Sequence, residues 1–186
     1  ATAKLLAETY QAHVLLGSRS LGSATNAANK IKGQVTPVEL NLAEEESITT
    51  STLKILQEHG TPTILINNAA VLKSDKFLEI SEQDLNESLL VNFKAPLMLI
   101  KIIAPKMIEN NYGRIINVSS SWGSFDEGLS GPFSYSITKA ALNALTLSAS
   151  QALPRTIKIN SLCPGWVRTE MGGMAAPKTA EKAASK

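Results

Sequence analysis

Short apolar segments alternate with helical patterns along nearly the whole chain, and this alternation restricts the fold more than any other feature. Strand-like segments cover residues 12–19, 34–41, 62–70, 113–120 and 156–165, and helical patterns cover residues 1–10, 21–31, 44–60, 81–110 and 135–153. Apolar strands that are separated by helices belong in a parallel sheet with helices on both faces. The sequence therefore predicts an α/β fold with a doubly wound parallel sheet in three αβα layers.

The ends of two predicted helices carry signals of their own. The helix at residues 44–60 has acidic residues in its first turn and Gly60 just past its end, which suits the helix dipole and a C-cap. The helix at residues 81–110 begins at Ser81 with Asp84 three residues later, which predicts a start similar to a capping box.

Composition excludes several classes of function. The chain has 186 residues, 44% of them hydrophobic, which is enough for one domain with a core, and its net charge of +2 does not suggest a nucleic-acid partner. Cys163 is the only cysteine and is expected to pack in a buried strand, while His13 and His59 lack ligand spacing, so no metal site is expected. No apolar run approaches the ~20 residues of a membrane helix and no signal peptide precedes the first helix. We therefore expect no membrane partner and a cytoplasmic location.

Polar residues follow the strand-like segments. The carboxyl ends of parallel strands share one edge of a sheet, which is where such folds bind ligands. We expect these residues to meet on a single rim. They are Ser18, Arg19, Asn41, Asn67, Asn68, Ser119, Ser120, Pro164 and Gly165.

One of the three tyrosines, Tyr135, stands four residues before Lys139 at the start of a predicted helix. Residues at this spacing share a helix face. An ammonium beside a phenol favours the phenolate, so we expect a lowered pKa for Tyr135 and proton exchange with a carbonyl or alcohol oxygen near neutral pH. Taken alone the pair is weak evidence, because the same spacing arises by chance in many helices.

Two other polar positions have a chemical and a structural interpretation. A serine hydroxyl at residues 119–121 could orient a substrate carbonyl, or it could belong to an ordinary turn after a strand. Asn92 interrupts an apolar helical run, where asparagine is unfavourable. It is either a satisfied buried amide or the mark of a helix distortion that exposes a carbonyl to a water molecule in a proton relay.

Together these motifs resemble the short-chain dehydrogenase/reductase family, in the family's order and over nearly the whole chain. The turn at residues 67–70 is similar to the family's N-N-A-G turn, with Ala70 in place of glycine. Asn92 matches the family's helix asparagine, Ser120 its catalytic serine and Pro164-Gly165 its P-G turn. Tyr135 and Lys139 match its Y-x-x-x-K pair, although the spacing from Ser120 to Tyr135 is slightly longer than is commonest.

The resemblance implies a Rossmann-like fold and an oxidoreductase that passes a hydride between a nicotinamide cofactor and a carbonyl or secondary alcohol. It implies that Tyr135 is the acid–base group and that Lys139 lowers its pKa and holds the nicotinamide ribose. Ser120 would orient the carbonyl, and Asn92 would support a water chain that refills the proton. The implied cofactor site comprises Ser18, Arg19, Asn41, Leu42, Asn68, Ala69, Ala70, Val91, Tyr135, Lys139, Pro164, Gly165, Val167 and Thr169.

NADP(H) is favoured over NAD(H) as the cofactor. Selection of NAD usually needs a carboxylate after the strand at residues 12–19, and Arg19 stands there instead. A guanidinium suits a 2′-phosphate through charge-assisted hydrogen bonds. Asn41 occupies the place where the family often has an aspartate that faces the adenine, and the family also contains asparagine there.

Parts of the family pattern are missing at both ends. The opening strand and its T-G-x-x-x-G-x-G turn are absent, and the last strand and helix should follow residues 171–176. The first strand would lie between the strands at residues 12–16 and 63–66, so its loss would leave two central edges unpaired. We therefore expect residues 1–186 to be part of a single Rossmann-type domain of a longer protein. We expect these residues alone to fold poorly and to bind no cofactor.

The substrate stays open between a free ketone or aldehyde and a 3-oxoacyl thioester. Outside catalysis, the alternative is a nucleotide-binding regulator of the same fold, against which Ser120, Tyr135 and Lys139 together argue. Trp166 and Met171 follow the P-G turn and could line an apolar pocket or simply pack. The expected partners are a small-molecule carbonyl or alcohol substrate and further copies of the chain, as a homodimer or homotetramer.

Overall fold

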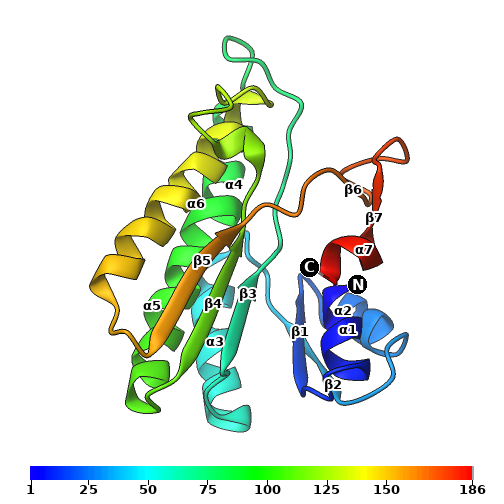
Figure 1. Ribbon diagram of the computed structural model, residues 1–186, viewed down its shortest axis with the longest axis vertical. Coiled ribbons are helices and arrows are strands. Elements are labelled where there is room, and N and C mark those ends of the chain that lie inside the picture. The colour runs from blue at the N-terminus through cyan, green and yellow to red at the C-terminus, as the bar shows by residue number, and fades with distance from the viewer. Residues whose placement is uncertain (186) are drawn as a thin grey trace. The chain divides into compact units, whose positions relative to one another are not determined.

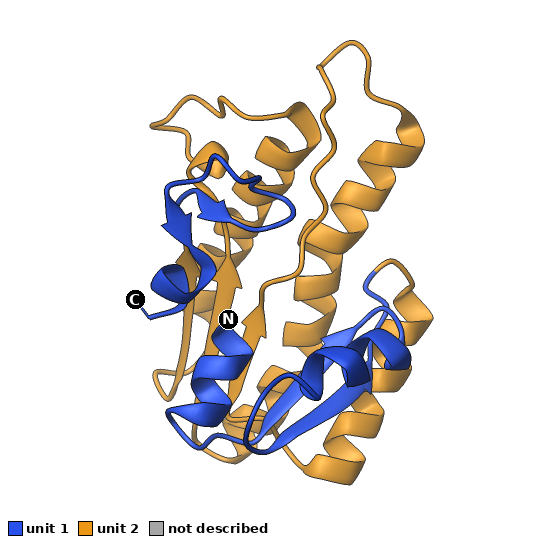
Figure 2. Ribbon diagram, turned by 90° about the vertical axis from the view of Figure 1, so that its right-hand side faces the viewer, with its two compact units in different colours: residues 1–42, 164–186 blue, residues 43–163 orange. Residues whose placement is uncertain are grey.

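The structure of the protein is a computed structural model that describes residues 1–185, and these form two compact units. The first unit comprises Ala1–Leu42 and the residues from Pro164 onward, and the second comprises Ala43–Cys163 (Figure 2). Every helix and strand expected from the alternating pattern is present in one of the two units (Figure 1).

The first unit contains a parallel pair of strands with short helices. Its elements are α1 (Thr2–Glu8), β1 (Val14–Ser18), α2 (Leu21–Ala28), β2 (Val35–Glu39), β6 (Val167–Arg168), β7 (Lys178–Thr179) and α7 (Ala180–Ala184). β1 pairs with β2 from Val14 opposite Val35 to Ser18 opposite Glu39, and α2 packs against both strands. β6 and β7 form a second parallel pair.

The second unit contains a three-stranded parallel sheet and the longest helices. Its elements are α3 (Glu45–His59), β3 (Ile64–Asn67), α4 (Glu82–Leu89), the π-helix η1 (Leu90–Lys94), α5 (Ala95–Glu109), β4 (Gly113–Val118), the 3₁₀ helix η2 (Ser121–Gly123), α6 (Phe133–Ala152) and β5 (Ile157–Leu162). The strand order is β3-β4-β5. Figure 1 shows α5 and α6 along the same face of this sheet.

The core of the second unit lies between α5 and the sheet. Buried and exposed side chains alternate along the first part of β5, as expected when one face of a strand packs on helices. The buried cluster consists of Ile100, Ile103, Ala104, Met107, Ile115, Ile157 and Ile159. Burial of these apolar side chains is the main force that holds α5 on β4 and β5.

The helix-end signals in the sequence are confirmed. The Ser81 hydroxyl oxygen accepts a hydrogen bond from the Asp84 backbone N–H at 3.0 Å and donates to the Asp84 carboxylate at 2.7 Å. Gly60 follows α3 with a φ of 75°, a backbone conformation that favours glycine. α6 begins two residues earlier than predicted, at Phe133, so Tyr135 lies in its first turn.

The continuous helical stretch Glu82–Glu109 is long and apolar enough to cross a membrane by length and composition, and it is the one such helix among the described residues. The sequence expectation of no membrane-length stretch considered only uninterrupted apolar runs and missed it. Half of its most apolar window is buried inside the protein, and its α5 part supplies much of the core cluster. A core helix of this kind meets the same criterion, so the stretch is weak evidence for a membrane span.

The expectation of unpaired strand edges is also confirmed. Among the described strands, β1 pairs only with β2, and β3 pairs only with β4. The strands β1 and β2 therefore form one parallel sheet and β3, β4 and β5 another, as expected when the strand between β1 and β3 is absent. The α/β class and the parallel direction of the strands agree with the prediction.

Candidate active site

A chain of polar side chains, buried except for Ser161, crosses the second unit at the carboxyl-terminal half of its strands. The strand register places Asn67, Asn117 and Ser161 side by side. Nδ2 of Asn67 donates to Oδ1 of Asn117 at 2.7 Å, and Nδ2 of Asn117 donates to Oγ1 of Thr146 on α6 at 2.9 Å. The Ser161 hydroxyl donates to the same Thr146 oxygen at 3.0 Å. This network ties α6 to all the strands of the sheet.

Sequence reasoning placed Asn67 at the end of its strand but did not single out Asn117 or Thr146. The available signal was a polar residue inside an apolar strand segment and another inside an apolar helical segment. The two adjacent asparagines at the end of β3 differ in their exposure. Asn67 is buried in the network, whereas Asn68 is exposed and available to a ligand.

Tyr135 lies in the first turn of α6 and is 8% exposed. Lys139 follows one turn later, and its Nζ lies 5.5 Å from the centre of the Tyr135 ring. The indole of Trp122 meets the same ring edge-to-face, with centroids 6.1 Å apart. The structure therefore brings Tyr135 and Lys139 together as their spacing predicts. The structure also places Trp122 beside this pair. The sequence signal for Trp122 was an aromatic residue directly after a run of serines.

Burial governs the protonation of this pair. Burial raises the pKa of the Tyr135 phenol, the nearby Cys163 raises that pKa further, and a hydrogen bond with Ser120 lowers it. Burial lowers the pKa of the Lys139 ammonium to about 8. The structure thus differs from the expectation that Lys139 lowers the pKa of Tyr135. The ammonium lies over the ring and donates to the backbone carbonyl of Val118 at 2.6 Å, so loss of hydration dominates for both groups.

The serines after β4 have different partners. Ser119 is buried, and its hydroxyl donates to the backbone carbonyl of Lys139 at 3.4 Å. The Ser120 hydroxyl oxygen accepts from the backbone N–H of Trp122 at 3.2 Å and caps η2. Ser120 is also the serine whose hydroxyl acts on the pKa of Tyr135. Of the two serines, Ser120 is therefore the one that interacts with the phenol, and its catalytic role stays a prediction.

Asn92 is fully buried in η1, where the helix widens to a π-turn. Its Oδ1 accepts from the backbone N–H of Val71 at 2.8 Å, and its Nδ2 donates to the Val71 carbonyl at 2.9 Å. Nδ2 also donates to Oγ1 of Thr138 on α6 at 3.1 Å. The amide is therefore satisfied, and the helix around it is distorted. π-Turns of this kind recur at functional sites.

Other candidate cofactor residues of the second unit lie near this group in the fold. Asn68 and Ala69 are exposed directly after β3, Ala70 is half-buried, and Val91 is buried in η1. A lysine ammonium has three N–H donors, and the hydrogen bond to Val118 uses one of those of Lys139. The remaining donors, beside the Tyr135 ring, fit the hydroxyl groups of a ribose.

The remaining candidate cofactor residues belong to the first unit. Ser18 ends β1, and the exposed guanidinium of Arg19 makes no hydrogen bond or ion pair with the described residues. Asn41 and Leu42 follow β2. Gly165 has a φ of 78°, and Nζ of Lys178 donates to the Pro164 carbonyl at 3.2 Å. Val167 begins β6, and the Thr169 hydroxyl oxygen accepts from the Gly172 N–H at 3.0 Å.

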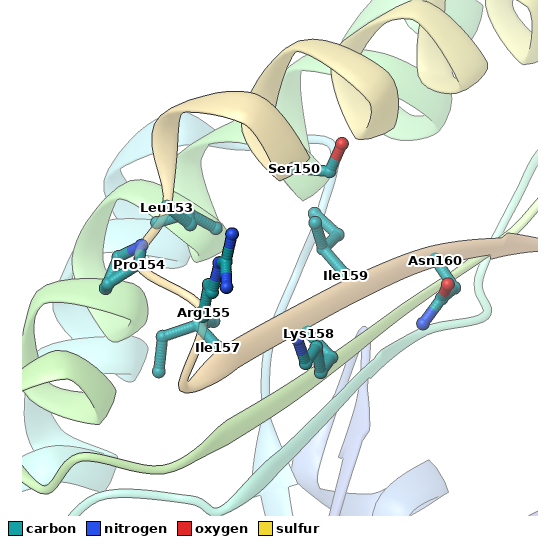
Figure 3. A pocket seen from close by; sticks show the side chains of 8 residues that line it. All are labelled: Ser150, Leu153, Pro154, Arg155, Ile157, Lys158, Ile159 and Asn160. Carbon is teal, nitrogen blue, oxygen red and sulfur yellow. The ribbon is translucent and has the colours of Figure 1, made fainter.

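Cys163 corrects one sequence expectation. It was expected to pack within a buried strand, but it is exposed, because β5 ends at Leu162 and the outer part of that strand is itself exposed. A pocket in the second unit lies away from Tyr135, where α6 ends and β5 begins (Figure 3). It is lined by Ser150, Leu153, Pro154, Arg155, Ile157, Lys158, Ile159 and Asn160, none of which is a candidate site residue.

Comparison with known proteins gives consistent matches. Residues 1–180 match the short chain dehydrogenase family. The 3-oxoacyl-[acyl-carrier-protein] reductase FabG of Aquifex aeolicus is 34% identical over 89% of this chain and 66% of its own length. Among solved structures, the carbonyl reductase Sniffer of D. melanogaster has a TM-score of 0.80 at 28% identity, over 92% of this chain and 77% of that one. A metagenomic short-chain oxidoreductase in complex with NADP has a TM-score of 0.73 at 26% identity, over 82% and 71% of the two chains.

A Rossmann-like α/β fold with a tyrosine and a lysine one helical turn apart defines the class of protein to which these matches point. The chain belongs to the short-chain dehydrogenase family. It spans 66% of the length of the Aquifex aeolicus reductase.

Proposed function

We propose that the protein is an oxidoreductase that reduces a carbonyl group with NADPH, and that Tyr135 gives the proton. The observation that carries this proposal is the cluster of Tyr135, Lys139 and Ser120 at the start of α6 and the end of β4. When bound, NADPH supplies a hydride to the carbonyl carbon. The protein's own residues must then hold the substrate and deliver a proton to its oxygen.

The protonation of the cluster suits donation. Because burial raises the pKa of Tyr135, its phenol keeps its proton at neutral pH and can give it to a carbonyl oxygen. Lys139, with a pKa of about 8, is mostly charged at neutral pH and would stabilise the phenolate that proton transfer leaves behind. The Ser120 hydroxyl, whose interaction with the phenol lowers the Tyr135 pKa, would orient the substrate oxygen.

The choice of NADPH rests on Arg19 and on similarity. The exposed guanidinium of Arg19 follows β1 and has no partner among the described residues, so it is available to a 2′-phosphate. The similar metagenomic oxidoreductase was solved in complex with NADP. The spare donors of Lys139 would hold the nicotinamide ribose, and Asn92 would fix the turn after β3 through Val71.

Two substrate classes have support. Similarity to the carbonyl reductase Sniffer favours a free ketone or aldehyde, and similarity to FabG favours a 3-oxoacyl thioester. The exposed face of Trp122, beside Tyr135, offers an apolar wall to either. A non-catalytic regulator is the least supported alternative, since it has no need of a phenol placed between a serine and a lysine.

The test is a kinetic assay of the natural protein. Oxidation of NADPH would be followed at the nicotinamide absorbance, with phenanthrenequinone as a free diketone and acetoacetyl-CoA as a 3-oxoacyl thioester. Tyr135→Phe should reduce kcat by roughly 10²–10⁴-fold. Tyr112→Phe, at an exposed tyrosine on the same unit, is the matched control and should leave kcat unchanged. Full turnover by Tyr135→Phe would refute the proposed mechanism.

A further inference from the structure

An extended segment after β3, the strap (residues 71–77), contacts helices of the second unit at several points. The Asn92 side chain bonds the backbone of Val71, and Lys73 pairs with Asp84 at 3.0 Å and Glu87 at 2.7 Å. Asp75 bonds Ser134, and the ring of Phe77, which is exposed, lies 5.0 Å from that of Phe133. Ser74 and Lys76, on either side of Asp75, are exposed, whereas Leu72 is half-buried. The strap is therefore held to α4 through Lys73 and to the start of α6 through Asp75, and it pairs with no strand among the described residues.

The contact between the strap and α6 is a carboxylate on the first turn of the helix. Oδ2 of Asp75 accepts from the Ser134 backbone N–H at 3.1 Å, and Oδ1 accepts from the Ser134 hydroxyl at 2.9 Å. The Phe133 N–H points to the Asp75 backbone carbonyl at 3.4 Å. α6 has no side-chain cap from its own N-cap residue, Pro132. Asp75 therefore satisfies helix N–H groups that would otherwise lack partners, and its charge suits the helix dipole.

Ser134 transmits this contact to the candidate active site. It is fully buried and directly precedes Tyr135 in the chain. Its hydroxyl oxygen also accepts a hydrogen bond from the Ser88 hydroxyl on α4 at 3.3 Å. Because these bonds fix the backbone of the first turn, they fix the direction in which the next side chain leaves the helix.

We propose that Asp75 is a positioning residue, which holds the Tyr135 phenol against Lys139 and Ser120 by anchoring the first turn of α6 through Ser134. This inference rests on the proposed function, in which Tyr135 is the proton donor. Removal of the carboxylate leaves the buried N–H and hydroxyl of Ser134 without their acceptor, so the first turn must shift or open. A shift of about 1 Å at a reacting group can reduce the rate by as much as 10²-fold.

The kinetic test compares Asp75→Ala with Asp126→Ala, which removes the same charge from an exposed position in the loop before α6. With NADPH and phenanthrenequinone or acetoacetyl-CoA, Asp75→Ala should reduce kcat roughly 10- to 100-fold while the KM for NADPH changes less than about twofold. Asp75→Asn keeps an acceptor for the Ser134 N–H and should recover most of kcat. Asp126→Ala should leave both constants unchanged. Equal kcat in Asp75→Ala and wild-type protein would overturn the proposal.

A second readout needs no turnover. The absorbance titration of the phenols, with the Tyr135→Phe curve subtracted, isolates Tyr135. Asp75→Ala should move this titration to lower pH, toward the ordinary tyrosine value of 10.0, because a loosened first turn admits water. Lys139 and Cys163, the groups that face the phenol, are the same in both proteins. If Asp75→Ala lowers the free energy of unfolding but leaves kcat and the Tyr135 titration unchanged, the role of Asp75 is structural only and the proposal is refuted.

Ser134→Ala keeps the inference testable if Asp75→Ala does not fold. It removes the hydroxyl contact and leaves the bond from Asp75 to the Ser134 N–H, so a smaller decrease in kcat, roughly 3- to 10-fold, is expected. No decrease in kcat would count against the proposal. If wild-type protein reduces neither substrate but the Tyr135 titration responds to Asp75→Ala, the proposed function fails and the positioning role stands. If wild-type turnover is normal and Asp75→Ala does not change it, the proposed function stands and the positioning role of Asp75 is wrong.

Discussion

The Lys139 ammonium lies 5.5 Å from the centre of the Tyr135 ring and donates a hydrogen bond to the backbone carbonyl of Val118 at 2.6 Å. The sheet, through Val118 at the end of β4, therefore fixes the charge that faces the phenol. Both side chains are buried, with Lys139 2% and Tyr135 8% exposed. Their protonation is thus set by the protein interior as much as by each other.

The first prediction concerns stability and pH at Lys139. Its pKa is about 8 in the folded protein against 10.5 ordinarily, so between these values the unfolded chain binds more protons and wild-type stability rises with pH. Lys139→Met removes this dependence. The variant should be inactive but more stable than wild type at neutral pH, by on the order of 2 kcal/mol after loss of the bond to Val118. The difference should shrink as pH rises from about 8 to 10.5.

Urea unfolding at a series of pH values measures this difference. Lys158→Met, at an exposed lysine on β5, is the control and should follow the wild-type pH dependence. A stability difference between Lys139→Met and wild type that stays constant with pH would contradict the burial effect on Lys139.

The second prediction concerns cofactor choice at Arg19. Arg19→Ala should raise the KM for NADPH roughly 10- to 100-fold and leave the KM for NADH within about twofold, because only the 2′-phosphate uses the guanidinium. Steady-state kinetics with each cofactor measures the ratio. Arg155→Ala removes another exposed guanidinium and should change neither constant. An unchanged ratio in Arg19→Ala would mean that the preference is set elsewhere.

The third prediction concerns the polar network at Asn117. Asn117→Ala leaves the buried amide of Asn67 without its acceptor and removes one of the donors to the Thr146 hydroxyl, which keeps its bonds with Ser161 and the Leu142 carbonyl, so the free energy of unfolding should fall by about 1–3 kcal/mol. Chemical denaturation measures this loss. Asn160→Ala, at an exposed asparagine on β5, should change stability by less than about 0.5 kcal/mol. Equal stabilities for the two variants would show that the network contributes nothing net.

The fourth prediction concerns the hold of Asn92 on the turn after β3. The Val71 N–H donates to the Asn92 side chain, so Asn92→Ala should speed hydrogen exchange at the Val71 amide at least roughly tenfold under native conditions. Asn86→Ala, on the exposed side of α4, should leave that rate unchanged. Unaltered exchange at Val71 in Asn92→Ala would mean that other contacts protect this amide.

Much of the fold follows from local patterns in the sequence. The alternation of apolar segments and helical spacing located the strands and helices, and Ser81 with Asp84 located the start of α4. The spacing of Tyr135 and Lys139 correctly placed their side chains together, since one helical turn separates them. These successes depend on residues that are close in sequence.

What the sequence did not show depends on contacts between distant residues. Ser134 and Asp75 are 59 residues apart, and Asn117 and Asn67 are 50 apart, so no local pattern links either pair. The expected lowering of the Tyr135 pKa considered the neighbouring charge but not the desolvation that packing imposes. Cys163 was expected to be buried because the strand was extended too far. The division of the described residues into two compact units also becomes visible only in three dimensions.

Within the strap, Lys73 and Asp75 contact helices while Ser74 and Lys76 are exposed, so the spacing of these residues matters as much as their identity. Inserting a single residue between Val71 and Asp75 would turn the lysine and the carboxylate away from α4 and α6, whereas inserting a pair would restore their facing. Selection should therefore allow insertions or deletions here only in pairs of residues, and amino-acid substitutions should accumulate fastest at Ser74 and Lys76. Residues 73–76, which pair with no strand in the part of the chain that the structure describes, would then show the alternating substitution pattern of a β-strand.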